Sequence, residues 1–216
     1  MGRRYARVLA TIVLAYAVII GLNETVAGGP GRLLVLGYLL FDAWQISDPT
    51  APRRRRKAAA VAVTAAAVVA FAAAAGTAAA ATRAVTSGVV GALSFALTAA
   101  VIAIVGRTVL RRRHLDSATV AGVLAVYLLL ALLFASLNQL LAAFNPTGYL
   151  AGVVGLPTAS DQLYFSVVTM ATIGYGDITP ASQLARAVVV VEALTGQLYL
   201  VSVVSAVVGG WRGRGE

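Results

Sequence analysis

The stretch TIGYGD, residues 172–177, carries glycine at two alternate positions. Glycine adopts backbone angles that are closed to other residues, so this alternation lets successive carbonyl oxygens point the same way. The flanking stretches 118–144 and 187–209 are apolar and long enough to cross a bilayer as helices. Residues 145–186 between them are too polar and too often interrupted by glycine and proline to cross as one helix. Because non-helical backbone at membrane depth must line water or be buried in protein, we predict a re-entrant segment here.

The composition also points to a bilayer. Of the 216 residues, 60% are hydrophobic and 12% are charged, and the mean hydropathy is positive. This is more apolar surface than a soluble fold of this size buries. The chain has no cysteine and one histidine, which excludes disulfides and thiolate chemistry. Neither an HExxH nor a GxSxG motif occurs, and we expect no enzyme activity.

Six apolar stretches have the length or composition of membrane spans. They are residues 5–22, 33–46, 58–81, 84–106, 118–144 and 187–209. The second stretch is short and contains Asp42, so it is either a span that borrows flanking residues or a re-entrant or interfacial segment. The sequence therefore predicts an all-α integral membrane protein with six transmembrane helices, and with a re-entrant segment between the fifth and the sixth; the resemblance described below makes this segment a pore helix and a selectivity filter.

The basic residues provide an independent test of this topology. With the N-terminus in the cytoplasm, only Arg32, Arg83 and Arg186 of the 17 basic residues fall on the outer side, as the positive-inside rule requires. We therefore expect a multi-pass protein of the cell membrane with both termini cytoplasmic. The same distribution explains the net charge of +9, so we expect no nucleic-acid partner. The clusters 53–57 and 111–113 could also bind anionic membrane lipids.

The fourth apolar stretch, 84–106, contains no arginine. Voltage sensing needs several charges inside such a helix, since each elementary charge gains about 2.3 kcal/mol per 100 mV. We therefore do not expect this helix to sense voltage.

We divide the chain into two domains. Residues 1–113 form a four-helix peripheral domain, which resembles a sensor in layout without its charges, and residues 114–216 form a pore domain.

A short helix is predicted immediately before the glycine-rich stretch, over residues 161–171. Ser160 or Asp161 is its expected N-cap, because these side chains accept backbone N–H bonds at helix starts. The C-terminus of the helix would point at residues 172–177. The negative end of its dipole would favour a cation there.

The longer stretch YFSVVTMATIGYGD, residues 164–177, resembles the pore of tetrameric potassium channels, especially the voltage-gated and two-pore-domain types. The resemblance covers residues 118–216. It implies a potassium-selective, passive channel in which three further copies of the chain complete the pore, because one filter per chain cannot close a ring of carbonyls. It also implies potassium ions in the filter as the sole cofactor. The implied ligands are the carbonyl oxygens of Thr172, Ile173, Gly174 and Tyr175, together with the Thr172 hydroxyl.

The resemblance also suggests residues that support the filter. Gly176 and Asp177 complete the motif, and Ala171 stands where many such pores have a threonine. A tryptophan pair is usual where Tyr164 and Phe165 stand. We therefore expect Thr169 to bind the hydroxyl of Tyr175, and Tyr164 to reach Asp177. Non-selective relatives usually lose Tyr175 or Asp177, and transporters with this motif usually carry four copies of it.

The last apolar stretch contains two further candidates. Gly196 occupies the position of the family's gating hinge, although a small residue for close helix packing is the alternative. Glu192 is an ionisable residue inside a span. It is expected either to support the pore helix through Thr169 or Ser166, or to face the cavity and concentrate ions. The expected cavity-lining residues are Gln197, Leu200, Val204 and Val208.

Overall fold

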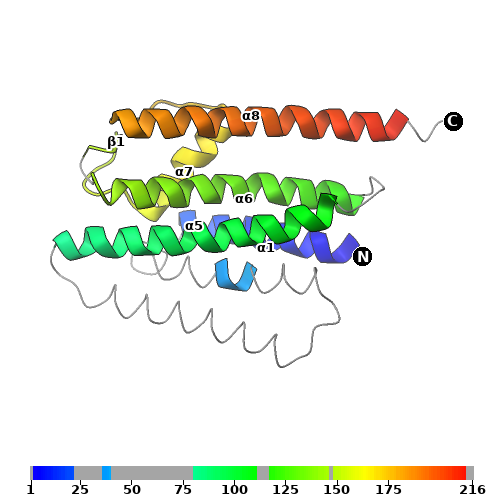
Figure 1. The fold of residues 1–216 in the computed structure, drawn as a ribbon, viewed down its shortest axis with the longest axis horizontal. Coiled ribbons are helices and arrows are strands. Elements are labelled where there is room, and N and C mark those ends of the chain that lie inside the picture. The colour runs from blue at the N-terminus through cyan, green and yellow to red at the C-terminus, as the bar shows by residue number, and fades with distance from the viewer. Residues whose placement is uncertain (1, 22–35, 40–79, 111–116, 146–147, 213–216) are drawn as a thin grey trace, which may run out of the picture.

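The computed structural model describes residues 2–21, 36–39, 80–110, 117–145 and 148–212. Helices dominate this part of the chain (Figure 1). In chain order the elements are α1 (Gly2–Gly21), α5 (Ala80–Leu110), α6 (Ser117–Ala142), β1 (Leu150–Ala151), α7 (Ala159–Met170), β2 (Thr179–Pro180) and α8 (Gln183–Arg212). Residues 36–39 add a helical turn.

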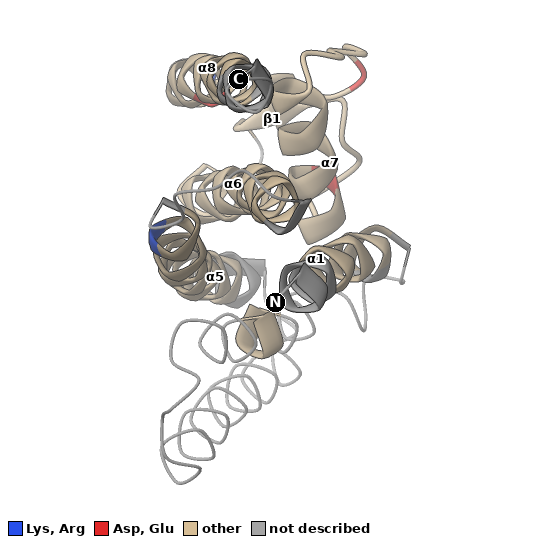
Figure 2. Ribbon diagram, turned by 90° about the vertical axis from the view of Figure 1, so that its right-hand side faces the viewer, with Lys and Arg blue, Asp and Glu red and all other residues tan. Residues whose placement is uncertain are grey.

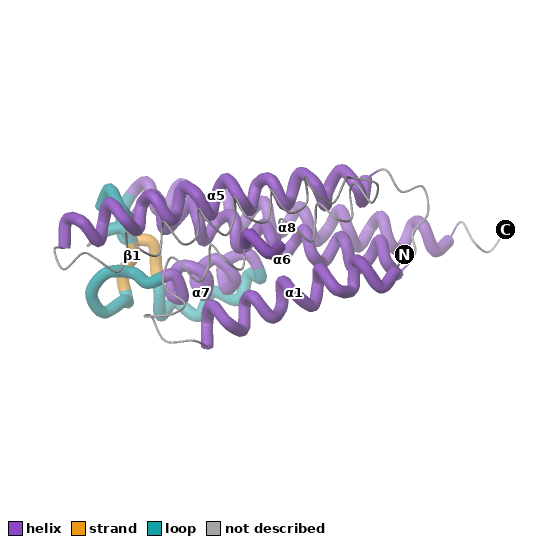
Figure 3. The backbone as a smooth tube through the Cα atoms, turned by 90° about the horizontal axis from the view of Figure 1, so that it is seen from below, coloured by secondary structure: helices purple, strands orange, loops and turns teal. Residues whose placement is uncertain are grey.

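The axes of the four long helices α1, α5, α6 and α8 are roughly parallel, and the chain runs in α1 and α6 opposite to its direction in α5 and α8 (Figures 1 and 3). Viewed end-on, α6 lies between α8 on one side and the pair α1 and α5 on the other (Figure 2). The short helix α7 packs against α1, α6 and α8. With 12 residues, α7 is too short to cross a bilayer, as expected of a re-entrant helix.

Three helices in the described part of the chain are long and apolar enough to span a membrane. They are Val85–Val109, Thr119–Ala142 and Gln183–Val203, which confirms membrane-length helices at the fourth, fifth and sixth predicted spans. The first predicted span forms α1. The second is described only over residues 36–39, and the third lies almost wholly outside the described residues, as do Asp42 and the basic clusters 53–57 and 111–113. Six spans thus stay a prediction.

Helix α6 is the centre of the packing. Its buried Leu129 and Leu132 contribute to a hydrophobic cluster with residues of α1, α5 and α7. The contact between α5 and α6 depends on small residues: a Cβ atom added to Gly91 would lie 2.7 Å from the backbone nitrogen of Leu140. Close backbone approach of this kind drives helix association where lipid removes the hydrophobic driving force.

A two-stranded antiparallel ribbon joins the two ends of the segment between α6 and α8. Leu150 pairs with Pro180 and Ala151 with Thr179. The sequence did not predict this ribbon, because two-residue strands leave no period in the sequence. The ribbon brings the chain that enters α7 beside the chain that leaves residues 172–177, so the segment closes on itself.

Candidate functional site

Helix α7 begins two residues earlier than predicted, at Ala159, and Thr158 is its N-cap. The Thr158 side chain accepts a hydrogen bond from the backbone N–H of Asp161 at 3.1 Å, and the Asp161 carboxylate accepts one from the backbone N–H of Thr158 at 2.9 Å. The predicted cap at Ser160 or Asp161 was therefore wrong. In this capping box the aspartate holds the third helical position and not the cap itself.

The C-terminus of α7 turns directly into residues 172–177. Three carbonyl oxygens of its last turn accept hydrogen bonds from the N–H groups that follow: Val167 from Ala171 at 2.9 Å, Thr169 from Thr172 at 3.0 Å, and Val168 from Ile173 at 2.9 Å. These are groups that a helix end leaves without partners. The N–H groups at the start of residues 172–177, called the filter stretch below, thus point back at α7.

The backbone of the filter stretch alternates between left-handed and ordinary angles. The φ values of Thr172, Gly174 and Gly176 are 57°, 58° and 81°, whereas Ile173 and Tyr175 have negative φ. Thr172 is the one non-glycine residue with positive φ in the described part of the chain. Left-handed angles are costly for a β-branched residue and occur mostly where function requires them.

All the predicted ion ligands lie on an open face of the single chain. Thr172, Ile173, Gly174 and Tyr175 are exposed, and the Tyr175 side chain retains 69% of its accessible surface. No hydrogen bond joins Tyr175 to Thr169 within the described residues, so that expected contact stays a prediction. An exposed row of ligands is what a ring built from several copies would require.

Asp177 is held by the residue that the sequence suggested. The Tyr164 hydroxyl donates a hydrogen bond of 2.7 Å to the Asp177 carboxylate. This bond lowers the pKa of Asp177 and raises the pKa of Tyr164. The carbonyl of Asp177 also lies against Gly152, where φ is +88° and a Cβ atom would overlap that oxygen. Gly152 is therefore a support residue that the sequence reasoning missed.

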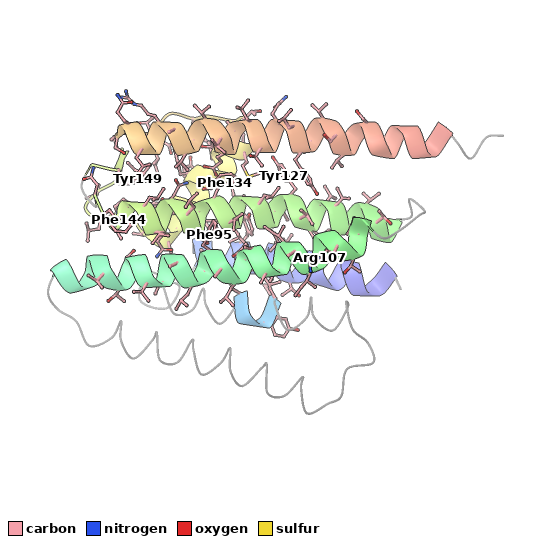
Figure 4. The ribbon with its side chains drawn as sticks, viewed as in Figure 1. Phe95, Arg107, Tyr127, Phe134, Phe144 and Tyr149 are labelled. Carbon is pink, nitrogen blue, oxygen red and sulfur yellow. The ribbon has the colours of Figure 1, made fainter. Side chains whose placement is uncertain are left out.

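A buried polar network lies behind α7. The amide nitrogen of Asn138 donates to Ser166 Oγ at 3.2 Å and to Glu192 Oε2 at 3.3 Å, and the Tyr149 hydroxyl donates to Asn138 Oδ1 at 2.7 Å. Asn138, Ser166 and Glu192 are fully buried, and Tyr149 retains 1% of its surface. Burial, followed by the charge of Glu192, raises the pKa of Tyr149. Figure 4 shows Tyr149 between the ends of α6 and α8.

The network connects α6, the residue before β1, α7 and α8, because one of its members comes from each. This geometry matches the first of the two interpretations of Glu192, support of α7, and brings it near Ser166. The sequence analysis did not identify Asn138 and Tyr149. The sequence did contain a signal for Asn138: an asparagine inside an otherwise apolar stretch usually binds a neighbouring helix.

The residues proposed for the gating hinge and for the cavity lining differ in their surroundings. Helix α8 continues without a break through Gly196, and a Cβ atom there would lie 2.7 Å from the carbonyl oxygen of Met170. Close packing, the alternative to a hinge, therefore explains this glycine in the structure, and the hinge stays a prediction. Gln197 is exposed and Leu200 half-buried, whereas the side chains of Val204 and Val208 lie outside the described residues.

Comparisons with known proteins match the same region. Residues 122–209 match the family described as "Ion channel". The inward rectifier potassium channel Kirbac3.1 of Paramagnetospirillum magnetotacticum is 54% identical over 41 residues, which are 19% of this chain and 14% of that protein. The protein LctB of Bacillus caldotenax is 33% identical over 90 residues, 39% of this chain and 66% of that protein. No solved structure matches the chain.

Proposed function

We propose, from the premise that residues 122–209 form an ion channel domain in a membrane protein, that this chain is one subunit of a potassium-selective channel. Its ion ligands are the carbonyl oxygens of Thr172, Ile173, Gly174 and Tyr175 and the hydroxyl of Thr172. Three further copies complete the pore. Transport is passive, so no reaction is catalysed.

The observation that carries this proposal is the alternation of backbone angles from Thr172 to Gly176. In an extended strand successive carbonyls point to opposite sides. Left-handed angles at every second residue rotate the peptide planes, so that successive carbonyls turn to one side. The N–H groups of Thr172 and Ile173 bind the end of α7, which leaves the carbonyls free to replace the water shell of a dehydrated cation.

The composition of the filter supports selectivity for potassium over other cations. Tyr175 and Asp177 are both present, and Asp177 is anchored to α7 by Tyr164. One relative that shares a short segment with this chain is by its name an inward rectifier potassium channel. A filter that is bonded to α7 keeps its carbonyl oxygens at a fixed spacing. The number and spacing of these oxygens determine which cation of a given charge binds best.

Four copies are supported by the surface that the single chain leaves open. The filter row is exposed, and α8 also presents several exposed apolar side chains. They are Val190, Val191, Leu194, Leu198 and Val201. Exposed apolar side chains along a helix favour contact with further copies of the chain and with lipid.

Purified protein in liposomes with opposing potassium and sodium gradients tests the proposal. We expect the reversal potential to lie near the potassium equilibrium potential and barium to block the current. A reversal potential near zero would refute potassium selectivity. Gly174→Ala should abolish selectivity, because φ is +58° there. Gly155→Ala is the matched control, since Gly155 also has positive φ and open space for a Cβ atom but lies outside the filter; it should behave as wild type.

A further inference from the structure

The carbonyl oxygen of Met170, the last residue of α7, is held from outside α7. The other three carbonyls of the last turn bind the N–H groups that follow them in the chain. The Met170 oxygen instead accepts a hydrogen bond of 3.0 Å from the Tyr127 hydroxyl of α6. Met170 retains 1% of its surface and stands two residues before Thr172, so its peptide unit fixes where the filter stretch starts.

Helix α8 also lies close to the Met170 oxygen. A Cβ atom added to Gly196 would lie 2.7 Å from the Met170 oxygen and 3.1 Å from the Met170 Cα atom. The absence of a side chain at Gly196 is therefore what allows α8 to approach. Three helices, α6, α7 and α8, meet at this one carbonyl.

The ring of Tyr127 is in turn packed against α8. Its centroid lies 5.8 Å from that of Tyr199, at an interplanar angle of 30°. The Tyr199 hydroxyl donates a hydrogen bond of 2.6 Å to the carbonyl of Val123, one turn before Tyr127 on α6. Figure 4 shows Tyr127 in the space between α6 and α8. The hydroxyl that holds Met170 is thus placed by an aromatic contact with α8.

We propose that Tyr127 is a positioning residue of the filter: its hydroxyl and Gly196 together fix the Met170 carbonyl, so that the geometry of the inner end of the filter follows the position of α8. The proposal rests on the proposed channel function and adds a residue and a coupling path to it. The path consists of side chains and backbone in direct contact, as physical coupling requires. A displacement of α8 at Gly196 or Tyr199 reaches Thr172 through the two peptide units that join Met170 to Thr172.

Tyr127→Phe tests the first step, because it removes the hydroxyl and keeps the ring. The measured quantity is the ratio of potassium to sodium permeability, taken from the reversal potential in liposomes with opposing gradients. This ratio does not depend on how many channels fold or insert, so a merely destabilising substitution leaves it unchanged. We expect it to fall about five-fold, the factor that corresponds to one hydrogen bond of ordinary net strength.

Tyr16→Phe is the matched control. Tyr16, on α1, also packs against the cluster that contains Met170 and donates its hydroxyl to a backbone carbonyl of α6, but to that of Leu128, whereas Tyr127 donates to that of Met170. The control should keep the wild-type permeability ratio. An unchanged ratio in Tyr127→Phe, or an equal fall in both variants, overturns the proposal. If wild type itself shows no selectivity, the proposed function fails first, so the two failures are distinguishable.

Gly196→Ala tests the second step and remains informative if Tyr127→Phe does not assemble. The added methyl group would displace the Met170 carbonyl and should lower the permeability ratio by a similar factor. In the double variant the two effects should not multiply, because both act on one oxygen. A wild-type ratio in Gly196→Ala, or effects that multiply fully, would contradict the coupling of α8 to the filter.

Discussion

Asp177 is the residue through which the end of the proposed filter is joined to α7. Its carboxylate is exposed in the single chain and accepts one side-chain hydrogen bond, from Tyr164. Because this bond favours the ionised form, the pKa of Asp177 is lowered. The stabilisation it gives is present above the ordinary pKa of aspartate and is lost as the pH falls through the lowered value.

Tyr164→Phe should therefore shift the acid sensitivity of the channel. Without the hydroxyl, the pKa of Asp177 rises towards its ordinary value, so the carboxylate becomes protonated at a higher pH. Current measured against external pH should show its acid loss at a higher pH in the variant than in wild type. Identical acid profiles would mean that Asp177 is held by another partner in the assembled channel.

Asn138 is the residue that links three buried polar side chains. Asn138→Ala would leave the Tyr149 hydroxyl, Ser166 and Glu192 without the partner that each has now. A buried polar group left unpaired costs about 1–3 kcal/mol, and we expect the free energy of unfolding to fall by about 3 kcal/mol per subunit. Thermal unfolding in detergent measures this.

The neighbouring substitution Gln139→Ala is the control for Asn138→Ala. Gln139 is also buried on α6, and its amide nitrogen donates a long hydrogen bond of 3.4 Å to Ser87, outside the network of Asn138. It should cost clearly less than Asn138→Ala. Equal losses would show that the network is no stronger than an ordinary helix contact.

At the scale of the element, α7 is a helix with both ends defined by specific hydrogen bonds. Thr158 and Asp161 close its start, and Tyr127 and the filter N–H groups satisfy its end. The end that faces the filter carries the negative side of the helix dipole. A cation beside it gains from this arrangement only if the helix keeps its position.

Thr158→Ala should lower the melting temperature because it removes the N-cap of α7. Loss of such a cap costs about 1 kcal/mol. Ser160→Ala is the matched control, since Ser160 was the cap that the sequence suggested, whereas the structure places it inside the helix. A larger loss in Ser160→Ala than in Thr158→Ala would restore the sequence-based assignment.

At the scale of the whole molecule, the single chain exposes the residues that the proposal assigns as ion ligands of a pore. A ring of carbonyls around one axis needs several chains. Native mass spectrometry of the detergent-solubilised protein should give an assembly of about four times the chain mass of 22.1 kDa. A monomer or a dimer that conducts potassium selectively would contradict the proposed assembly.

The filter stretch, the fourth to sixth spans, the existence of α7 and the contact of Tyr164 with Asp177 could be predicted from the sequence. The spans, the short helix and the alternate glycines depend on neighbouring residues, whereas the contact of Tyr164 with Asp177 was expected from the resemblance to potassium-channel pores. These features can be predicted without knowing how the helices are rotated about their axes.

The network of Asn138, Tyr149 and Glu192, the approach of Gly196 to Met170, and the hold of Tyr127 on that carbonyl were decided by the tertiary structure. Their partners lie between 11 and 54 residues apart for the hydrogen bonds. An apolar stretch predicts that a helix crosses the membrane but not which face it turns to its neighbour, because lipid and protein interior are similarly apolar. The sequence alone thus determined which residues form the proposed filter, whereas helix packing determined which residues hold it in place.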